Sequence, residues 1–219
     1  MSFWHRFIHP VTAHFRRGRG AFLQSQFPQI STWKICDLGG SRHFWEKVDI
    51  GVPPANITIY NISENEAQAI SADVKEEPRI VIYDGKKIPA ADLEFDLLIC
   101  NSVLEHVNPE DRPRLAAEMV RVAKRIFVQT PAYSFPIEPH FVMPFIHWLP
   151  RQLGYYLAHV SPWRLLSKPT HETICQYWWG TQLLKEEELK GLFPDGAVEY
   201  ERIIGIVKSY YVVLSKSGA

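Results

Sequence analysis

Short apolar segments alternate with amphipathic segments over most of the chain between residues 34 and 130. Short buried runs separated by helical patterns are typical of a parallel sheet that helices cover on both faces. Five runs predict the parallel strands: Lys34–Leu38, Asn56–Tyr60, Arg79–Tyr83, Phe95–Cys100 and Arg125–Thr130. The pattern therefore predicts an α/β fold with a doubly covered sheet.

Apolar residues at helical spacing predict a covering helix from Pro109 to Ala123, capped by Asn108, and a second helix from Gln182 to Phe193. After the second helix, Val198–Ile204 and Lys208–Leu214 predict two strands that pair antiparallel at the edge of the sheet. Together with the five earlier strands they predict a seven-stranded, mostly parallel sheet with one antiparallel edge strand.

The regular alternation stops between Pro131 and Gly180, where proline, histidine and aromatic residues are dense. A long irregular segment in a compact domain is typical of a lid or binding loop, so residues 131–180 are expected to form a substrate lid between strands five and six. Its most apolar part, Phe141–Pro150, is expected to cover an acceptor, to form the lid's own core, or to face a membrane.

Residues 1–33 mix aromatic and basic side chains and contain no acidic residue. They predict a leader that packs on the domain of residues 34–219, with one short helix at Ala21–Phe27. The arginines of the run Arg16-Arg17-Gly-Arg19 are expected to be solvated.

The formal net charge of the 219 residues is zero, so no overall field favours a nucleic-acid partner. Cys36, Cys100 and Cys175 lack the spacing of a metal site and indicate a reducing environment, which predicts a cytoplasmic protein. No apolar window is long enough to cross a bilayer, and peripheral membrane contact stays open as an alternative.

Glycines or polar residues follow each of the first four predicted strands. Because parallel strands end at the same edge of a sheet, where ligands bind, these residues are expected to line one crevice. They are Asp37-Leu-Gly-Gly40, Asn61-Ile-Ser63, Asp84-Gly85 and Asn101-Ser-Val-Leu-Glu-His106. The first of these loops has no basic residue and does not continue as G-x-G-x-x-G, which argues against a dinucleotide cofactor.

With these loops the chain resembles the class I S-adenosylmethionine-dependent methyltransferases, close to the type 11 subgroup, from about Lys34 to Thr130. The resemblance implies a Rossmann-like fold with S-adenosyl-L-methionine as cofactor. It also implies a set of cofactor contacts. Asp37, Gly39 and Gly40 would contact the methionine portion, and Asn61 would contact the ribose. Asp84, Gly85 and Leu104 would contact the adenine, and Asn101 and Ser102 would lie beside the reacting methyl group.

Asn61 departs from the family pattern, which has an acidic residue at this position to bind both ribose hydroxyls. An amide removes charge-assisted acceptors, so we expect weaker cofactor binding, or a contact from Glu64 in its place.

Methyl transfer depends mainly on alignment, and a base is needed chiefly when the acceptor is a hydroxyl. The expected catalytic residues are His106 and His140; the alternative for His106 is a packed structural histidine, and the alternative for His140 is aromatic packing of the lid. The expected substrate residues are Glu138, His140, His147 and Trp148. We therefore expect methyl transfer to a small-molecule or lipid-like acceptor at oxygen, with nitrogen or carbon methylation and a non-catalytic scaffold as the alternatives.

The pair Glu105-His106 also resembles metal-dependent quinone-ring O-methyltransferases, which carry another glutamate three residues earlier. Ser102 occupies that position here, so no metal is expected.

Overall fold

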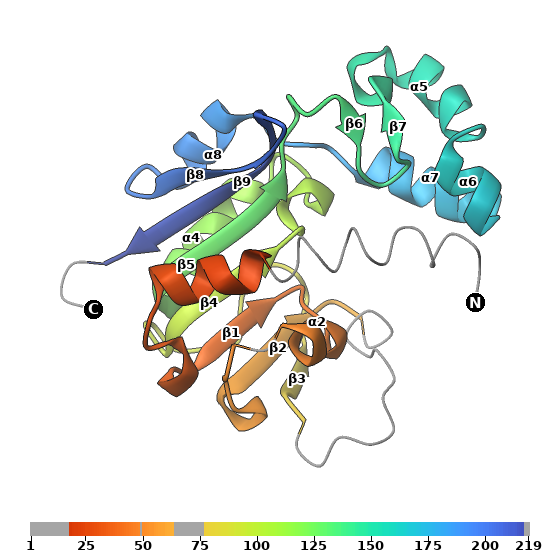
Figure 1. Cartoon of the computed structure of the whole chain (residues 1–219). Helices are drawn as coiled ribbons and strands as arrows, with labels where there is room; N and C mark the ends of the chain where they lie inside the picture. Colours follow the sequence, from red (N-terminus) through yellow and green to blue (C-terminus); the bar gives the residue numbers. More distant parts are fainter. Residues whose placement is uncertain (1–17, 49, 64–76, 217–219) are drawn as a thin grey trace.

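A seven-stranded sheet forms the centre of the computed structural model, which describes residues 18–48, 50–63 and 77–216 (Figure 1). The strand order is β3-β2-β1-β4-β5-β9-β8, and β9 pairs antiparallel with both β5 and β8 while the other pairs are parallel. The strands are β1 (Ile35–Leu38), β2 (Ile57–Asn61), β3 (Arg79–Ile82), β4 (Phe95–Asn101), β5 (Ala123–Pro131), β8 (Ala197–Ile203) and β9 (Ile206–Ser215). The predicted fold class is confirmed, and each strand lies within two residues of its predicted bounds.

Helices cover both faces of the sheet, and every residue of β1 and β2 is buried. On one face, α4 (Arg112–Val122) and α8 (Glu186–Leu192) contribute Met119 and Leu189 to a core cluster that includes Leu98 of β4. On the other face, α2 (Arg42–Lys47) and the helical residues 18–26 cover the sheet, and Figure 1 shows the latter helix lying across β4 and β5. The described part of the predicted leader therefore belongs to the core, and residues 1–17 lie outside the described residues.

Two predicted helix starts were wrong, because a local hydrogen bond in one case and a long-range one in the other hold non-helical conformations there. Residues 108–111 form a turn in which Asp111 N–H donates to the Asn108 carbonyl at 2.9 Å, so α4 begins at Arg112 and its N-cap is Asp111. Residues 181–185 run extended, since Tyr133 N–H donates to the Leu184 carbonyl at 3.0 Å, and α8 begins only at Glu186.

The segment from 131 to 180 was predicted to be irregular, but it folds into a small hairpin and a group of helices beyond the carboxyl end of β5 (Figure 1). We call residues 132–180 the insertion. Its elements are β6 (Ile137–Glu138), β7 (Met143–Pro144), η4 (Ile146–Trp148), α5 (Arg151–Ala158), α6 (Pro162–Ser167) and α7 (His171–Gly180). Prolines are compatible with the first turn of a helix, and Ser161 and Thr170 cap α6 and α7 with side-chain hydrogen bonds.

The insertion has its own apolar core, made of Phe141, Ile146, Ala158, Ile174 and Trp178. Short 3-10 turns complete the chain: η1 (Ile30–Thr32), η2 (Pro54–Asn56) and η3 (Leu104–His106). Among the described residues, no helix combines the length and the apolar character that crossing a membrane requires.

Candidate active site

The strand order reverses between β1 and β4. Open α/β sheets bind ligands beside the loops that leave the carboxyl ends of the strands at such a point, and we call this position the crevice. Asp37 of β1 is buried there, and Trp45 Nε1–H donates to its Oδ2 at 2.6 Å. Gly39 has φ +70°, and a Cβ on Gly40 would overlap the Asp37 carboxylate. Both glycines are therefore required for this turn.

Burial raises the pKa of Asp37 to about 7, and the hydrogen bond from Trp45 only partly opposes this. A cation placed beside the carboxylate would favour its ionised form and lower that pKa again. The turn after β1 is therefore suited to a cationic ligand.

Asn61 connects the turn after β1 to the turn after β2. Its Nδ2 donates to the Gly40 carbonyl at 3.1 Å, and its Oδ1 accepts the backbone N–H of Ile62 at 2.8 Å. A carboxylate here could not donate the first of these hydrogen bonds, which gives the amide a structural reason. The ribose contact of Asn61 stays a prediction, and Glu64 lies outside the described residues.

The three predicted adenine contacts differ in how accessible they are to a ligand. Asp84 is exposed, and its Oδ1 accepts the backbone N–H groups of Lys86 and Lys87, which lower the pKa of this carboxyl. Gly85 follows with φ +73°. Leu104, in contrast, is fully buried in the core cluster beneath the sheet and has no exposed surface, so we reassign it from adenine contact to core residue.

At the end of β4, Arg19 from the helix of residues 18–26 donates to Asn101 Oδ1 at 2.6 Å. The expectation that Arg19 is solvated was wrong, because only 7% of the residue is exposed. Its position four residues before the buried Leu23 places both on one helix face, a signal present in the sequence. Ser102 follows with φ +55°, and its hydroxyl donates to Gln129 Oε1 at 2.8 Å.

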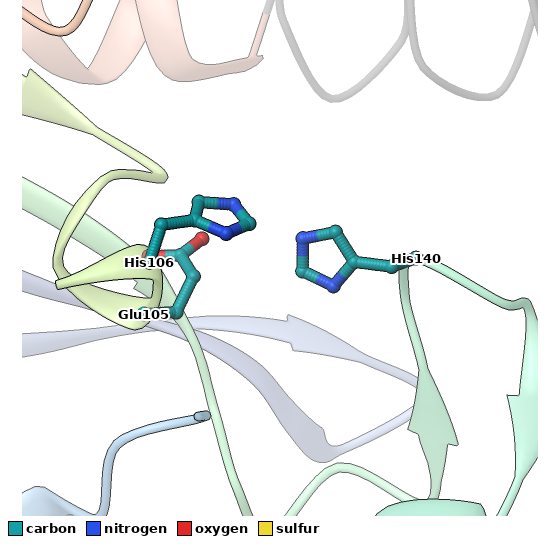
Figure 2. Close-up of side chains that lie close together, drawn as sticks. All are labelled: Glu105, His106 and His140. Carbon is teal, nitrogen blue, oxygen red and sulfur yellow. The ribbon is translucent and has the colours of Figure 1, made fainter. Parts of the chain in front are cut away.

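Beyond Ser102, η3 brings Glu105 and His106 opposite His140 of the insertion (Figure 2). One possible ligand atom of each residue lies within 4.8 Å of those of the other two. The centroids of the two imidazole rings are 5.0 Å apart, and the rings are nearly perpendicular. Glu105 is fully buried, and its Oε2 accepts the Thr130 hydroxyl at 3.0 Å. The sequence predicted both histidines as catalytic, and the structure brings them together.

The environments of the two histidines shift their pKa values in opposite directions. Removal from water, followed by the neighbouring His140, lowers the pKa of His106 to about 4. Burial opposes the charged form of His140 as well, yet the hydrogen bond to Glu138 outweighs it and raises the pKa of His140. Because a carboxylate can only accept, His140 Nδ1–H donates to Glu138 Oε1 at 2.7 Å, which leaves Nε2 directed elsewhere.

A cavity of about 210 Å³ lies between the insertion and the loop before α8. Glu138 and Thr181 are in its lining, and through their contacts to His140 and His106 they connect the cavity to the histidine pair. His147 also lines it, with Nε2 3.0 Å from the Tyr133 carbonyl. Trp148 donates to the same carbonyl and is 44% exposed. Of the predicted substrate residues, Glu138 and His147 therefore line the cavity, whereas His140 and Trp148 do not.

Comparison with known families agrees with this arrangement. The family described as a methyltransferase domain matches residues 39–126, from the glycine turn after β1 into β5. Residues 39–126 therefore form a methyltransferase domain of the type 11 family, and the sheet has the class I S-adenosylmethionine-dependent methyltransferase fold. No curated protein sequence matches this methyltransferase.

Solved structures share the fold of the methyltransferase at low sequence identity. The magnesium protoporphyrin IX methyltransferase of Synechocystis PCC 6803 with bound SAH is 13% identical, with a TM-score of 0.60 over 99% of this chain and 89% of that one. An SAM-dependent methyltransferase from Archaeoglobus fulgidus is 13% identical, with a TM-score of 0.55 over 92% and 94%. Human N-acetylserotonin methyltransferase in complex with SAM is 17% identical, with a TM-score of 0.51 over 90% and 51%.

In the methyltransferase, the predicted cofactor residues thus divide into two groups. Asp37, Gly39, Gly40, Asn61 and Asn101 lie on the crevice side of β1, β2 and β4. Asp84 and Gly85 form a surface turn after β3, Ser102 bonds Gln129, and Leu104 belongs to the core. Sequence reasoning missed Arg19, Trp45 and Thr181, which contact the predicted residues from other elements.

Proposed function

We propose that the methyltransferase transfers the methyl group of S-adenosylmethionine to a hydroxyl oxygen of a small, partly apolar acceptor. The observation that supports oxygen is the cluster of Glu105, His106, Glu138 and His140 at the edge of the cavity. A hydroxyl must lose its proton, or have its pKa lowered, as the methyl group arrives, whereas a neutral amine needs neither. The cluster supplies groups that can do this.

The position of the cluster supports the same conclusion. His106 lies in η3, directly after the loop of Asn101 and Ser102 that family resemblance puts beside the reacting methyl group. His140 approaches from the insertion, and Glu138 holds its ring by the 2.7 Å hydrogen bond. An acceptor in the cavity would therefore have its hydroxyl between the cofactor crevice and the two imidazoles.

The lining of the cavity supports a small acceptor with an aromatic or alkyl body. Tyr133, Phe141 and Trp178 provide apolar surface, and Arg151 and Gln182 add polar groups. Ligand sites typically combine a mostly apolar wall with a few polar groups that fix orientation.

The acceptor atom is tested with labelled S-adenosylmethionine and matched compounds that share one ring and differ only in carrying a hydroxyl, an amino or a carboxyl group. The hydroxyl compound should be methylated at oxygen, and His140→Ala should lower kcat about 100-fold with a small change in KM. His171→Ala, which removes an exposed histidine of α7, is the matched control. A preference for the amine, or methylation at a ring carbon, would refute the proposal.

We also propose that the insertion contacts an anionic membrane surface. Residues 139–171 contain no Asp or Glu but include Arg164 and Lys168 of the α6 region. On α5 and the turn that follows it, Leu153, Tyr156 and Val160 have the i, i+3, i+7 spacing of one helix face and are 49%, 69% and 57% exposed. An exposed apolar face with basic neighbours is typical of helices that lie in the interface of anionic lipids.

Vesicle flotation tests this contact with the full chain. Binding should occur on anionic vesicles, weaken with salt and be absent on zwitterionic vesicles, and the double variant Leu153→Glu with Tyr156→Glu should abolish it. Ile204→Glu introduces the same charge at another exposed apolar residue, in the β8–β9 turn, and should leave flotation unchanged. Equal loss in both variants, or equal binding to both vesicle types, would contradict the proposal.

A further inference from the structure

We propose that Glu105, His106 and His140 bind a divalent transition-metal ion. Each offers one ligand atom, and these atoms lie within 4.8 Å of one another (Figure 2). Two of the ligands come from η3, directly after the strand that borders the cofactor crevice, and the third comes from the insertion. The ion would thus connect the two halves of the active site.

Glu105 has an unused oxygen of the kind that a metal ion requires. The side chain is fully buried, and Thr130 occupies only Oε2, so within the described part of the chain Oε1 has no hydrogen-bond partner. Buried polar atoms almost always have a partner, because an unpaired one loses its water without compensation. A cation bound at Oε1 supplies the missing interaction.

His140 is held as a metal-binding histidine is typically held. Its Nδ1–H donates to Glu138 Oε1 at 2.7 Å, and the other oxygen of Glu138 accepts the backbone N–H of Phe141 at 2.7 Å. A carboxylate behind a histidine fixes the tautomer and the ring orientation, and it makes the opposite nitrogen a better ligand. Nε2 of His140 is therefore the nitrogen available to a metal ion, which binds in place of any proton on it.

The ligand set indicates which ions fit. Two imidazoles and one carboxylate with open positions suit Zn²⁺, Fe²⁺, Mn²⁺ or Co²⁺, whereas Mg²⁺ and Ca²⁺ prefer oxygen ligands. Bonds of about 2.0–2.2 Å in a tetrahedral site put ligand atoms about 3.3–3.6 Å apart, so binding draws these ligand atoms together by at most about 1.5 Å. His106 can make this movement because the residue is exposed and its contact to Thr181 Oγ1 is long, at 3.3 Å.

The sequence alone argued against a metal because Ser102 replaces the expected first glutamate. The Ser102 hydroxyl indeed points to Gln129 Oε1, at 2.8 Å. The third ligand is instead His140, which the fold of the insertion brings to the Glu105-His106 pair.

A role for the ion in catalysis rests on the proposed function: a bound cation would take the acceptor oxygen as a further ligand and lower the pKa of its hydroxyl. Binding of the ion itself does not depend on that proposal, and it can be measured without an acceptor.

The test uses the full chain, treated with a chelator and then titrated with Zn²⁺, Co²⁺ or Mg²⁺ alone. We expect one equivalent of Zn²⁺ and of Co²⁺ to bind, with a visible absorption band for Co²⁺, and Mg²⁺ to bind at least about 100-fold more weakly. Glu105→Gln and His140→Ala should each reduce the Zn²⁺ affinity by about 100-fold or more, and Glu138→Gln by about 10- to 100-fold.

His171→Ala is the matched control, because His171 is a surface histidine outside the proposed site, with its Nδ1 3.7 Å from Cys175 Sγ. Its Zn²⁺ affinity should equal that of the unmodified chain. Urea unfolding of each variant establishes that it is folded before its affinity is compared.

Three outcomes would overturn the inference: no Zn²⁺ binding by the folded chain, binding that persists in Glu105→Gln and His140→Ala, or binding that only His171→Ala removes. Oxygen methylation by a chain that binds no metal would leave the proposed function intact and remove this site. Metal binding without oxygen methylation would support the site and overturn its role in activating a hydroxyl.

Discussion

Asp37 is the buried carboxyl at the end of β1, and its protonation predicts how the stability of the protein depends on pH. Burial raises its pKa from 3.8 to about 7, with Trp45 opposing. Since the pKa is higher in the folded state than in the unfolded chain, the folded state binds this proton more tightly. The resulting stabilisation is fully present below about pH 4 and is lost as the pH rises through about 7.

The magnitude follows from the two pKa values. Each pH unit between about 4 and about 7 lowers the free energy of unfolding by about 1.4 kcal/mol, which gives about 4 kcal/mol over the whole interval for this one group. Asp37→Asn preserves the shape and an acceptor for Trp45 Nε1–H but does not titrate. Relative to the unmodified chain, the variant should therefore gain about 4 kcal/mol of stability between pH 4 and pH 8.

Asp96→Asn is the matched control on the neighbouring strand β4. Partial burial opposes ionisation of Asp96, but the hydrogen bond from Lys124 at 2.8 Å and the backbone N–H of Lys34 lower its pKa. A carboxyl whose pKa is lowered on folding stabilises the fold at pH values above its pKa in the unfolded chain. This stabilisation is lost only as the pH falls through the pKa of the folded state. Asp96→Asn should therefore be destabilised by the same amount at every pH from 5 to 8.

Urea unfolding at five pH values between 4.5 and 8.5 measures both differences. The reasoning would be refuted if Asp37→Asn and the unmodified chain gave parallel plots of unfolding free energy against pH, because a buried, protonated carboxyl requires them to converge or cross.

The same carboxyl predicts that cofactor binding releases a proton. The sulfonium and ammonium groups of S-adenosylmethionine favour ionised Asp37, and with a pKa of about 7 the free protein carries about 0.8 proton on this group at pH 6.5. Calorimetry in buffers of different ionisation enthalpy should therefore show release of about 0.8 proton at pH 6.5 and almost none at pH 8.5. Equal heats in all buffers at pH 6.5 would contradict a cation beside Asp37.

Three further substitutions test packing at separate places. Gly40→Ala places a Cβ against the Asp37 carboxylate and should cost about 1–3 kcal/mol in urea unfolding and weaken cofactor binding in calorimetry. Arg112→Ala removes a buried guanidinium that bonds Glu188 and the carbonyls of residues 107 and 182, and should lower the unfolding free energy by about 3 kcal/mol. Gly154→Ala drives a Cβ into Trp178 of the insertion, so acceptor KM should rise while the cofactor Kd stays unchanged; a changed cofactor Kd would contradict this separation.

The strands and the crevice could be predicted from the sequence because both depend on local patterns. A strand buried on both faces must be apolar along its length, so Ile57–Asn61 and Phe95–Asn101 stand out from their polar surroundings. The carboxyl ends of parallel strands share one edge, so the residues that follow them are brought together by topology alone. Asp37 and Asn61 could be found in this way.

Features that depend on contacts between distant segments could not be predicted in this way. The role of Asn61 was predicted only from its expected contact to the ribose. Its amide also donates to the Gly40 carbonyl, a contact that exists only because the fold brings the two loops side by side. Arg19 was predicted to be solvated because its neighbours are basic. It is buried instead, because it shares a helix face with Leu23. The predicted start of α8 failed for the same reason, since the hydrogen bond from Tyr133 N–H to the Leu184 carbonyl outweighed the helical spacing of these residues.

The histidine pair shows this dependence most clearly, because both sides of it are fixed by the ends of the insertion. At its beginning, Phe141 is buried against Trp178, and the N–H of Phe141 holds Glu138, which in turn orients His140. Just after its end, Gln182 N–H donates to the Glu105 carbonyl at 2.7 Å and so fixes η3. The cluster can therefore form only when the insertion is folded and docked. Loosening this core should disperse the histidine pair while leaving the crevice around Asp37 intact.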